Sequence, residues 1–332
     1  MFTRRVSSLA TWQTASRRLS TATPTGTQKP FVKIVDVSPR DGLQNEKTPV
    51  PTTIKLQLIE RLTAANVPAI ETTAFVSPKW VPQMADAKLV LPAILQHYST
   101  NGKDYPVLVP NVKGLERALA ASPQYPVKEI AIFGAASEGF SQKNTNTSVE
   151  EGLKAFEDVI ALAHKNDVKV RGYLSTVIAC PYDGPTDPKR VAELAQRYID
   201  IGCYELSLGD TIGVGTPATI ERMLEEVLKK VPAEKLAIHA HDTYGQGVSN
   251  VLKAVEMGIR VVDSSVGGLG GCPYAKGASG NVSTEDVVYA LHGLGYETGI
   301  NLEELAKIGD WITKELGRPN GSRAGSAIFS KL

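Results

Sequence analysis

Eight short runs rich in β-branched residues alternate with longer amphipathic runs from residue 31 onward, and this alternation limits the chain to very few folds. The strand-like runs are 31–38, 69–75, 105–110, 128–137, 168–177, 203–211, 236–242 and 261–268. Patterns typical of helices lie between and after them, at 52–67, 148–166, 187–202, 216–231, 282–295 and 301–316. Strands that alternate with helices favour a parallel sheet covered by helices.

Eight strand–helix units within residues 30–317 predict an α/β chain folded as a (β/α)8 TIM barrel, which typically needs about 250 residues. The run at 301–316 then forms an additional C-terminal helix. An open doubly wound sheet is the alternative, but no glycine-rich nucleotide-binding fingerprint follows the first strand. Because TIM barrels carry their active sites at the carboxyl ends of the strands, polar residues at those ends are the candidates for chemistry.

Composition excludes several classes of partner. The chain has 332 residues with 36 Lys and Arg against 35 Asp and Glu, so its net charge of +1 gives no reason to expect nucleic acid. No apolar run is long enough for a membrane helix, and we expect no membrane insertion. Three cysteines are too few for a disulfide framework, which favours a reducing compartment.

The two ends of the chain resemble targeting signals. Residues 1–29 contain four arginines, many Ser and Thr residues and no acidic residue, which predicts a mitochondrial transit peptide and linker; a disordered cationic tail is the alternative. Residues 318–332 are expected to form a tail, and they end in Ser330-Lys331-Leu332, a peroxisomal address. We therefore expect a mitochondrial matrix protein with a second address for the peroxisome.

Two of the five histidines stand two residues apart at the end of the seventh strand-like run, in the sequence LAIHAHD. His239 and His241 therefore point to the same face of the strand, about 6.7 Å apart. Inside a barrel, two imidazoles in an apolar shell repel each other when charged, and a metal ion resolves this conflict. The alternative is that one histidine is a hydrogen-bonded core residue and the other caps the strand.

Two other strand ends supply oxygen ligands. Asp41 follows the first strand, and Asn281 ends the glycine-rich stretch that follows the eighth. With His239 and His241 they make a set of two nitrogens and two oxygens. Such a set suits Mg²⁺ or Mn²⁺ and leaves two octahedral positions for a chelating substrate, although these residues also suit Zn²⁺.

Charged and nucleophilic residues near these ligands are candidates for catalysis. Arg40 could stabilise a developing enolate oxygen, or it could form an ion pair with Glu71 or Glu46. Glu71 ends an apolar run and needs a partner if it is buried. Cys272 lies in the glycine-rich stretch and is a candidate acid/base, or merely a lining residue.

The end of the sixth strand contributes a further group of candidates. Asp210 and Thr211 lie at this end, and Ser207 lies earlier on the same strand. Asp210 could instead cap the following helix.

Four motifs together resemble the 3-hydroxy-3-methylglutaryl-CoA lyase family of metal-dependent barrel lyases and Claisen synthases. They are SPRDGLQNE (38–46), LGDTIGVGTP (208–217), HAHDTYGQG (239–247) and SVGGLGGCPYAKGASGN (265–281). The resemblance covers about 31–316. Arg-Asp-Gly and His-x-His are shared by the wider superfamily, whereas the RDGLQNE continuation and the GLGGCPY stretch are narrower.

The resemblance implies a role for each matching position. The metal ligands would be Asp41, His239, His241 and Asn281, holding Mg²⁺ or Mn²⁺. The catalytic residues would be Arg40, Asp41, Glu71, Asp210, His239 and Cys272. The substrate-binding residues would be Arg40, Gln44, Lys47, Tyr173, Ser207 and Thr211. It also implies a homodimer, but residues 317–332 lack the cysteine that animal-type members can use for a redox-sensitive link between subunits.

The function implied by the resemblance is retro-Claisen cleavage of 3-hydroxy-3-methylglutaryl-CoA to acetoacetate and acetyl-CoA, a step of leucine catabolism and ketone-body formation. One alternative is a Claisen-condensing acyltransferase acting on a 2-oxo acid. Such enzymes are expected to carry a further C-terminal domain, and this expectation weighs against the alternative. Another is a metal-binding barrel that has lost its chemistry, but none of the four expected ligands is missing.

Overall fold

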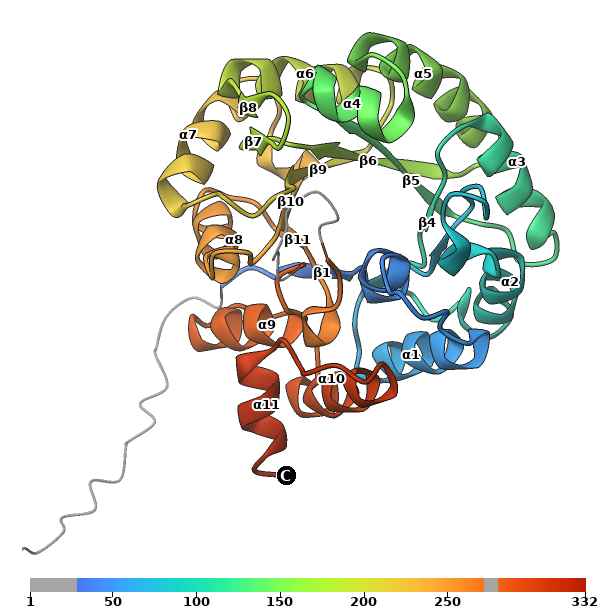
Figure 1. The fold of residues 1–332 in the computed structure, drawn as a ribbon, viewed down its shortest axis with the longest axis vertical. Coiled ribbons are helices and arrows are strands. Elements are labelled where there is room, and N and C mark those ends of the chain that lie inside the picture. The colour runs from blue at the N-terminus through green and yellow to red at the C-terminus, as the bar shows by residue number, and fades with distance from the viewer. Residues whose placement is uncertain (1–28, 272–279) are drawn as a thin grey trace, which may run out of the picture.

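The computed structural model describes residues 29–271 and 280–332, and it forms a ring of parallel strands surrounded by helices (Figure 1). The ring strands are β1 (Lys33–Asp36), β2 (Ala69–Ile70), β3 (Thr73–Ala74), β4 (Val107–Leu108), β5 (Glu129–Ala135), β6 (Lys169–Ser175), β9 (Glu205–Asp210), β10 (Leu236–Ala240) and β11 (Val261–Ser264). They pair in the order β2-β1-β11-β10-β9-β6-β5-β4-β3. All eight strand-like runs predicted from the sequence contain a strand.

The two ends of this sheet, β2 and β3, are halves of one strand, and this strand closes the barrel. Ala69 of β2 pairs with Val35 of β1, whereas Thr73 of β3 pairs with Val107 of β4. Glu71 and the residue after it lie between the two halves. With β2 and β3 counted together, eight parallel strands form the ring, and the predicted TIM barrel is confirmed.

Helices cover the outside of the ring (Figure 1). They are α1 (Thr52–Ala64), α2 (Ala87–Tyr98), α3 (Val112–Ala121), α4 (Glu138–Thr145), α5 (Val149–Lys165), α6 (Pro188–Asp200), α7 (Pro217–Val227), α8 (Gly247–Glu256), α9 (Thr284–Gly293), α10 (Leu302–Glu315) and α11 (Arg323–Phe329). Single helical turns lie at Ser38–Gly42, Pro82–Met84, Ala233–Lys235 and Val266–Gly268, and an antiparallel hairpin joins β7 (Ala179–Cys180) to β8 (Gly184–Pro185). The six helices that the sequence predicted are all present.

Local sequence signals explain where several helices begin and end. α5 begins at a capping box in which Ser148 and Glu151 satisfy each other's backbone N–H groups. α7 begins at Thr216, with Pro217 in its first turn. Gly202 follows α6 with φ of +113°, a conformation that favours glycine, and a Cβ there would lie 2.9 Å from Ile160 Cγ2. The buried faces of the helices pack against the ring strands in one large apolar core.

The C-terminal segment differs from its prediction. Residues 318–332, expected to be a tail, contain α11, so the C-terminal addition has two helices instead of the one predicted. The Ser322 hydroxyl caps α11 by accepting from Gly325 N–H and donates to the carboxylate of Asp286 on α9, 2.9 Å away. Asp286 also accepts from the backbone N–H of Ala324. These bonds dock a helix of only 7 residues, which is too short to show hydrophobic periodicity in the sequence.

Two predictions fall outside the described residues. The transit peptide lies in 1–29, of which the structure describes only the last residue, and Cys272 lies in 272–279. Among the helices of the described ranges, none combines the length and apolarity needed to cross a membrane.

Candidate active site

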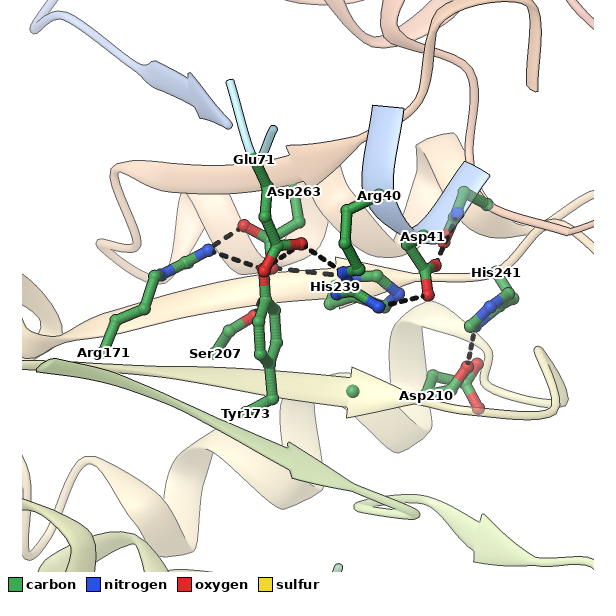
Figure 2. Close-up of polar contacts among 12 residues, drawn as sticks. Arg40, Asp41, Glu71, Arg171, Tyr173, Ser207, Asp210, His239, His241 and Asp263 are labelled. Atoms are coloured by element: carbon green, nitrogen blue, oxygen red, sulfur yellow. Dashed lines mark hydrogen bonds and ion pairs between the residues drawn. The ribbon is translucent and has the colours of Figure 1, made fainter. Parts of the chain in front are cut away.

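Three predicted ligands meet at the carboxyl end of the barrel. Asp41 lies in the helical turn after β1, His239 lies on β10, and His241 follows that strand directly. One ligand atom from each lies within 4.8 Å of the others, and the two imidazole centroids are 5.1 Å apart. Figure 2 shows the three side chains converging on one point.

Asn281 joins this cluster from the strand-like segment beside β10. It forms an isolated antiparallel bridge with His241, and its Nδ2 donates to Asp41 Oδ2 at 2.8 Å. Its Oδ1 is buried and has no hydrogen-bond partner within residues 29–271 and 280–332. A buried amide oxygen without a partner is costly unless it meets a ligand, so Asn281 fits a metal site.

The environment of His241 also suits a metal ligand. Its Nδ1 lies 2.9 Å from the backbone carbonyl oxygen of Asp210, which fixes the proton on Nδ1 and leaves the Nε2 lone pair free. Burial and the neighbouring His239 lower the pKa of His241 to about 4, so the ring is neutral at physiological pH. Burial alone would raise the pKa of Asp41, but Arg40 and His239 outweigh it and lower that pKa.

Arg40 is held by two carboxylates. Its Nε donates to Glu71 Oε2 at 2.7 Å and its Nη1 donates to Asp41 Oδ1 at 2.7 Å. Glu71 is completely buried and also accepts from the Tyr173 hydroxyl at 3.2 Å. Of the two partners predicted for Arg40, the structure therefore shows Glu71. The other, Glu46, pairs with Arg318 at 2.8 Å. Burial alone would lower the pKa of Arg40, but Glu71 and Asp41 raise it, so the guanidinium stays charged.

Beneath these residues lies an ion network that we did not predict. Arg171 of β6 is 1% exposed and contacts Glu205 Oε1 at 2.9 Å and Asp263 Oδ1 at 3.0 Å. It also donates to the Tyr173 hydroxyl at 2.9 Å. A charged residue inside an apolar strand, as in KVRGYLS and VVDSS, is the signal that could have found Arg171 and Asp263.

Three further candidates, Ser207, Asp210 and Thr211, lie on or directly after β9, and their side chains bond to groups other than the predicted metal ligands. The Ser207 hydroxyl donates to Asp263 Oδ2 at 2.6 Å, and Thr211 Oγ1 accepts from Thr176 N–H at 2.7 Å. Asp210 Oδ2 accepts from Gly215 N–H, whereas Thr216 caps α7, so Asp210 is not the helix cap. Its Oδ1 is buried without a partner in the part of the chain that the structure describes, and burial raises the pKa of Asp210 to about 6.

The remaining predicted contacts lie at the rim. Gln44 is half-buried at the end of the turn after β1, and Lys47 is exposed. Lys47 lines an open cavity of about 940 Å³, which Gly271 and Arg318 also line. Asn45 Nδ2 donates to the carbonyl oxygen of Gly271 at 2.9 Å and thereby ties the first motif to the glycine-rich stretch.

The two ends of the glycine-rich stretch lie side by side. Ser265 N–H donates to the carbonyl oxygen of Val282, and Val282 N–H donates to that of Ala240. Asn281 Nδ2 also bonds to the carbonyl oxygen of Leu269 at 3.2 Å. The position of Asn281 is thus set by β10 and by the start of the stretch.

A protein-family model described as HMGL-like matches residues 31–312. The chain belongs to the HMGL-like family. A relative from Arabidopsis thaliana named "Hydroxymethylglutaryl-CoA lyase, mitochondrial" is 54% identical over 302 residues, which cover 91% of this chain and 63% of that protein. A rat protein of the same name is 54% identical over 313 residues, 94% of each chain. Other HMGL-like relatives are named as cytoplasmic.

A solved HMGL-like structure agrees with the barrel described above. The hydroxymethylglutaryl-CoA lyase of Pseudomonas aeruginosa superposes with a TM-score of 0.86 at 50% sequence identity. The match covers 91% of this chain and 98% of that one.

Proposed function

We propose that this HMGL-like chain cleaves 3-hydroxy-3-methylglutaryl-CoA to acetoacetate and acetyl-CoA. The observation that carries the proposal is the convergence of Asp41, His239, His241 and Asn281 beside the buried cation Arg40. The names of relatives about 54% identical support the same reaction.

We infer that the four converging residues hold a divalent cation, either Mg²⁺ or Mn²⁺. Two imidazole nitrogens, one carboxylate and one amide oxygen provide the donors, and the oxygen donors are of the kind that these ions bind. When bound, the cation supplies Lewis acidity that lowers the pKa of a tertiary alcohol and polarises an acyl oxygen.

The chain's own residues perform the proton transfers and stabilise charge. A base at the metal cluster removes the proton from the tertiary hydroxyl, and Asp41 and His239 are the candidates for this base. The bond between C2 and C3 then breaks, its electron pair moves to C2, and the C3 oxygen becomes the ketone of acetoacetate. The product at C2 is a thioester enolate, whose oxygen Arg40 stabilises with a permanent positive charge.

Glu71 and Tyr173 keep Arg40 in place for this task. Arg40 Nε is bonded to Glu71, whose oxygen also accepts from Tyr173, and the guanidinium lies 5.5 Å from the tyrosine ring centroid. Burial raises the pKa of Glu71 despite Arg40, and Asp210 has a raised pKa as well, so both are candidates to exchange protons with the substrate.

Protonation of the enolate carbon gives acetyl-CoA. By the family resemblance we assign this step to Cys272 or His239. Gln44, Lys47 and Thr211 are proposed to contact the substrate on the same ground, and Lys47 has the strongest support, because it lines the open cavity at the rim. Ser207, which the resemblance also assigns to the substrate, is completely buried and donates its hydroxyl proton to Asp263 instead.

The test is an acetoacetate assay on the purified chain with Mg²⁺, with Mn²⁺ and with EDTA. His241→Ala removes one ligand, and His97→Ala, a change at an exposed histidine on α2, is the matched control. We expect cation-dependent acetoacetate from the wild-type and control proteins, and a loss of at least 100-fold in His241→Ala. Absence of acetoacetate from folded, cation-bound protein would refute the proposal and direct the search to condensation with 2-oxo acids.

We further propose that the chain is a homodimer, that residues 1–29 direct it to the mitochondrial matrix, and that Ser330-Lys331-Leu332 directs part of it to peroxisomes. The last three residues are exposed beyond α11, where a receptor could reach them. Fluorescent fusions at one end, with the other left free, test each signal separately. Sedimentation of the purified chain tests the dimer.

A further inference from the structure

Asp263 is the residue of the buried ion network that faces the metal cluster. It lies on β11, where it is completely buried and is the register partner of His239 on the neighbouring parallel strand β10. Register partners on parallel strands project to the same face, so both side chains enter the barrel interior side by side. Figure 2 shows Asp263 between Arg171 and His239.

Both carboxylate oxygens of Asp263 have defined partners. Oδ1 accepts from Arg171 Nη2 at 3.0 Å, and Oδ2 accepts from the Ser207 hydroxyl at 2.6 Å. Oδ2 also lies 3.4 Å from His239 Nδ1, an ion-pair distance that a small rotation of the ring would shorten to a hydrogen bond. Among the described residues, His239 Nδ1 has no other polar partner.

Because Nδ1 lies near Asp263, we assign the other ring nitrogen of His239, Nε2, to the cluster formed with Asp41 and His241. The imidazole packs edge-on against Tyr173, with centroids 6.0 Å apart and planes at 82°, and this contact restricts its rotation. If Nδ1 carries a proton directed at Asp263, then Nε2 carries the free lone pair. A metal-binding histidine commonly donates its other ring N–H to a carboxylate in this way, which fixes the tautomer and raises the basicity of the ligand.

We propose that Asp263 is a positioning residue that fixes the tautomer and the orientation of His239 for binding of the divalent cation. This inference rests on the proposed function, because it deepens the assignment of His239 as a ligand. Asp263 does not touch the substrate; it acts through His239. Ser207, which the resemblance assigned to the substrate, serves in this arrangement to hold Asp263.

The competing explanation is that Asp263 exists only to neutralise Arg171. Glu205 provides the comparison, since it contacts the same guanidinium at 2.9 Å, is 4% exposed and lies on β9. Removing the charge of Glu205 or of Asp263 leaves Arg171 with one carboxylate in either case. Only the change at Asp263 alters the surroundings of His239.

The experiment measures Mn²⁺ binding to the full chain without substrate, by electron paramagnetic resonance of the free ion. Asp263→Asn keeps the shape of the side chain and removes its charge, and Glu205→Gln is the matched control. We expect the dissociation constant for Mn²⁺ to rise 10- to 100-fold in Asp263→Asn, a range typical for loss of such a partner. In Glu205→Gln it should change less than about 3-fold.

A second measurement needs no substitution at Asp263, so poor folding of Asp263→Asn would not leave the proposal untested. In ¹⁵N-histidine NMR spectra of the metal-free wild-type chain at pH 9, His239 should be the tautomer protonated at Nδ1. Loss of its signals in His239→Ala assigns the resonance. An Nε2-protonated tautomer would overturn the proposal.

The binding outcomes separate this inference from the proposed function. Equal Mn²⁺ affinity in Asp263→Asn and wild type, or equal weakening in both variants, overturns the role of Asp263 while cleavage by the wild-type chain still supports the function. Absence of Mn²⁺ binding by the wild-type chain overturns both.

Discussion

The stability of the barrel should depend strongly on one buried cation. Arg171→Met keeps most of the apolar stem of the side chain but removes the guanidinium that Glu205 and Asp263 share. All three side chains are buried, with Arg171 only 1% exposed, so neither carboxylate can turn to water for compensation. Breaking a buried pair by removing one partner costs about 3–5 kcal/mol, because the remaining charge is left without compensation.

The pKa of Asp263 reflects the same buried charges. Burial alone would raise this pKa, yet Arg171 and His239 lower it from 3.8 to about 2. A depressed carboxyl pKa stabilises the fold above pH 4, and that stabilisation, about 2 kcal/mol, is lost as the pH falls through 2. In Arg171→Met, burial prevails and Asp263 protonates at a higher pH, so the stability deficit of the variant should shrink as the pH is lowered from 7 to 5.

Calorimetry of the metal-free chain measures this prediction. For a folded unit of about 300 residues, 1 kcal/mol corresponds to roughly 1.6 °C, so we expect the melting temperature to fall by about 5–8 °C at pH 7. The matched control is Arg197→Met, which removes an ion pair to Glu150 at the surface, where both side chains are more than a third exposed. That change should move the melting temperature by less than about 2 °C. Similar shifts in both variants would refute the reasoning.

Three further changes test other parts of the fold. Glu285 is fully buried, and burial raises its pKa to about 8. The stability of the wild-type chain should therefore fall as the pH rises from 4.5 to 8. Glu285→Gln should abolish this pH dependence, as measured by urea titrations across that range. Gly309→Ala should destabilise by roughly 1–3 kcal/mol, because its Cβ would lie 2.1 Å from Glu285 Oε1. Gly152→Ala within α5 has no contact closer than 3.8 Å and should raise stability by about 0.5–1 kcal/mol, measured by the same unfolding curves; destabilisation would contradict the helix-propensity argument.

The sequence predicted the ring of strands well because a strand of a TIM barrel is buried on both faces. Such strands appear as short runs of branched apolar residues, and their alternation with amphipathic runs is hard to mistake. The closing strand is an exception, since Glu71 interrupts it and splits it into β2 and β3. The short hairpin of β7 and β8 was missed because two-residue strands carry no periodicity.

The candidate site could be predicted where residues lie at strand ends, and less well where they lie deeper. Period-two alternation shows which face a side chain occupies, but it does not show its depth along the barrel. Tyr173 and Ser207 were predicted to bind substrate, yet their hydroxyls bond to Glu71 and Asp263 one layer below the opening. Their depth follows from strand register, which places Ser207 beside Ala237 rather than beside His239.

The paired ends of the glycine-rich stretch have a consequence for how the metal cluster is held. Within the described residues, Asn281 is fixed by its bridge to His241 after β10 and by its bond to the carbonyl oxygen of Leu269. The proposed ligands His239, His241 and Asn281 therefore take their positions from the pairing of the barrel strands and of the segments that continue them. The same backbone bonds that complete the sheet thus also set the geometry of the reaction centre.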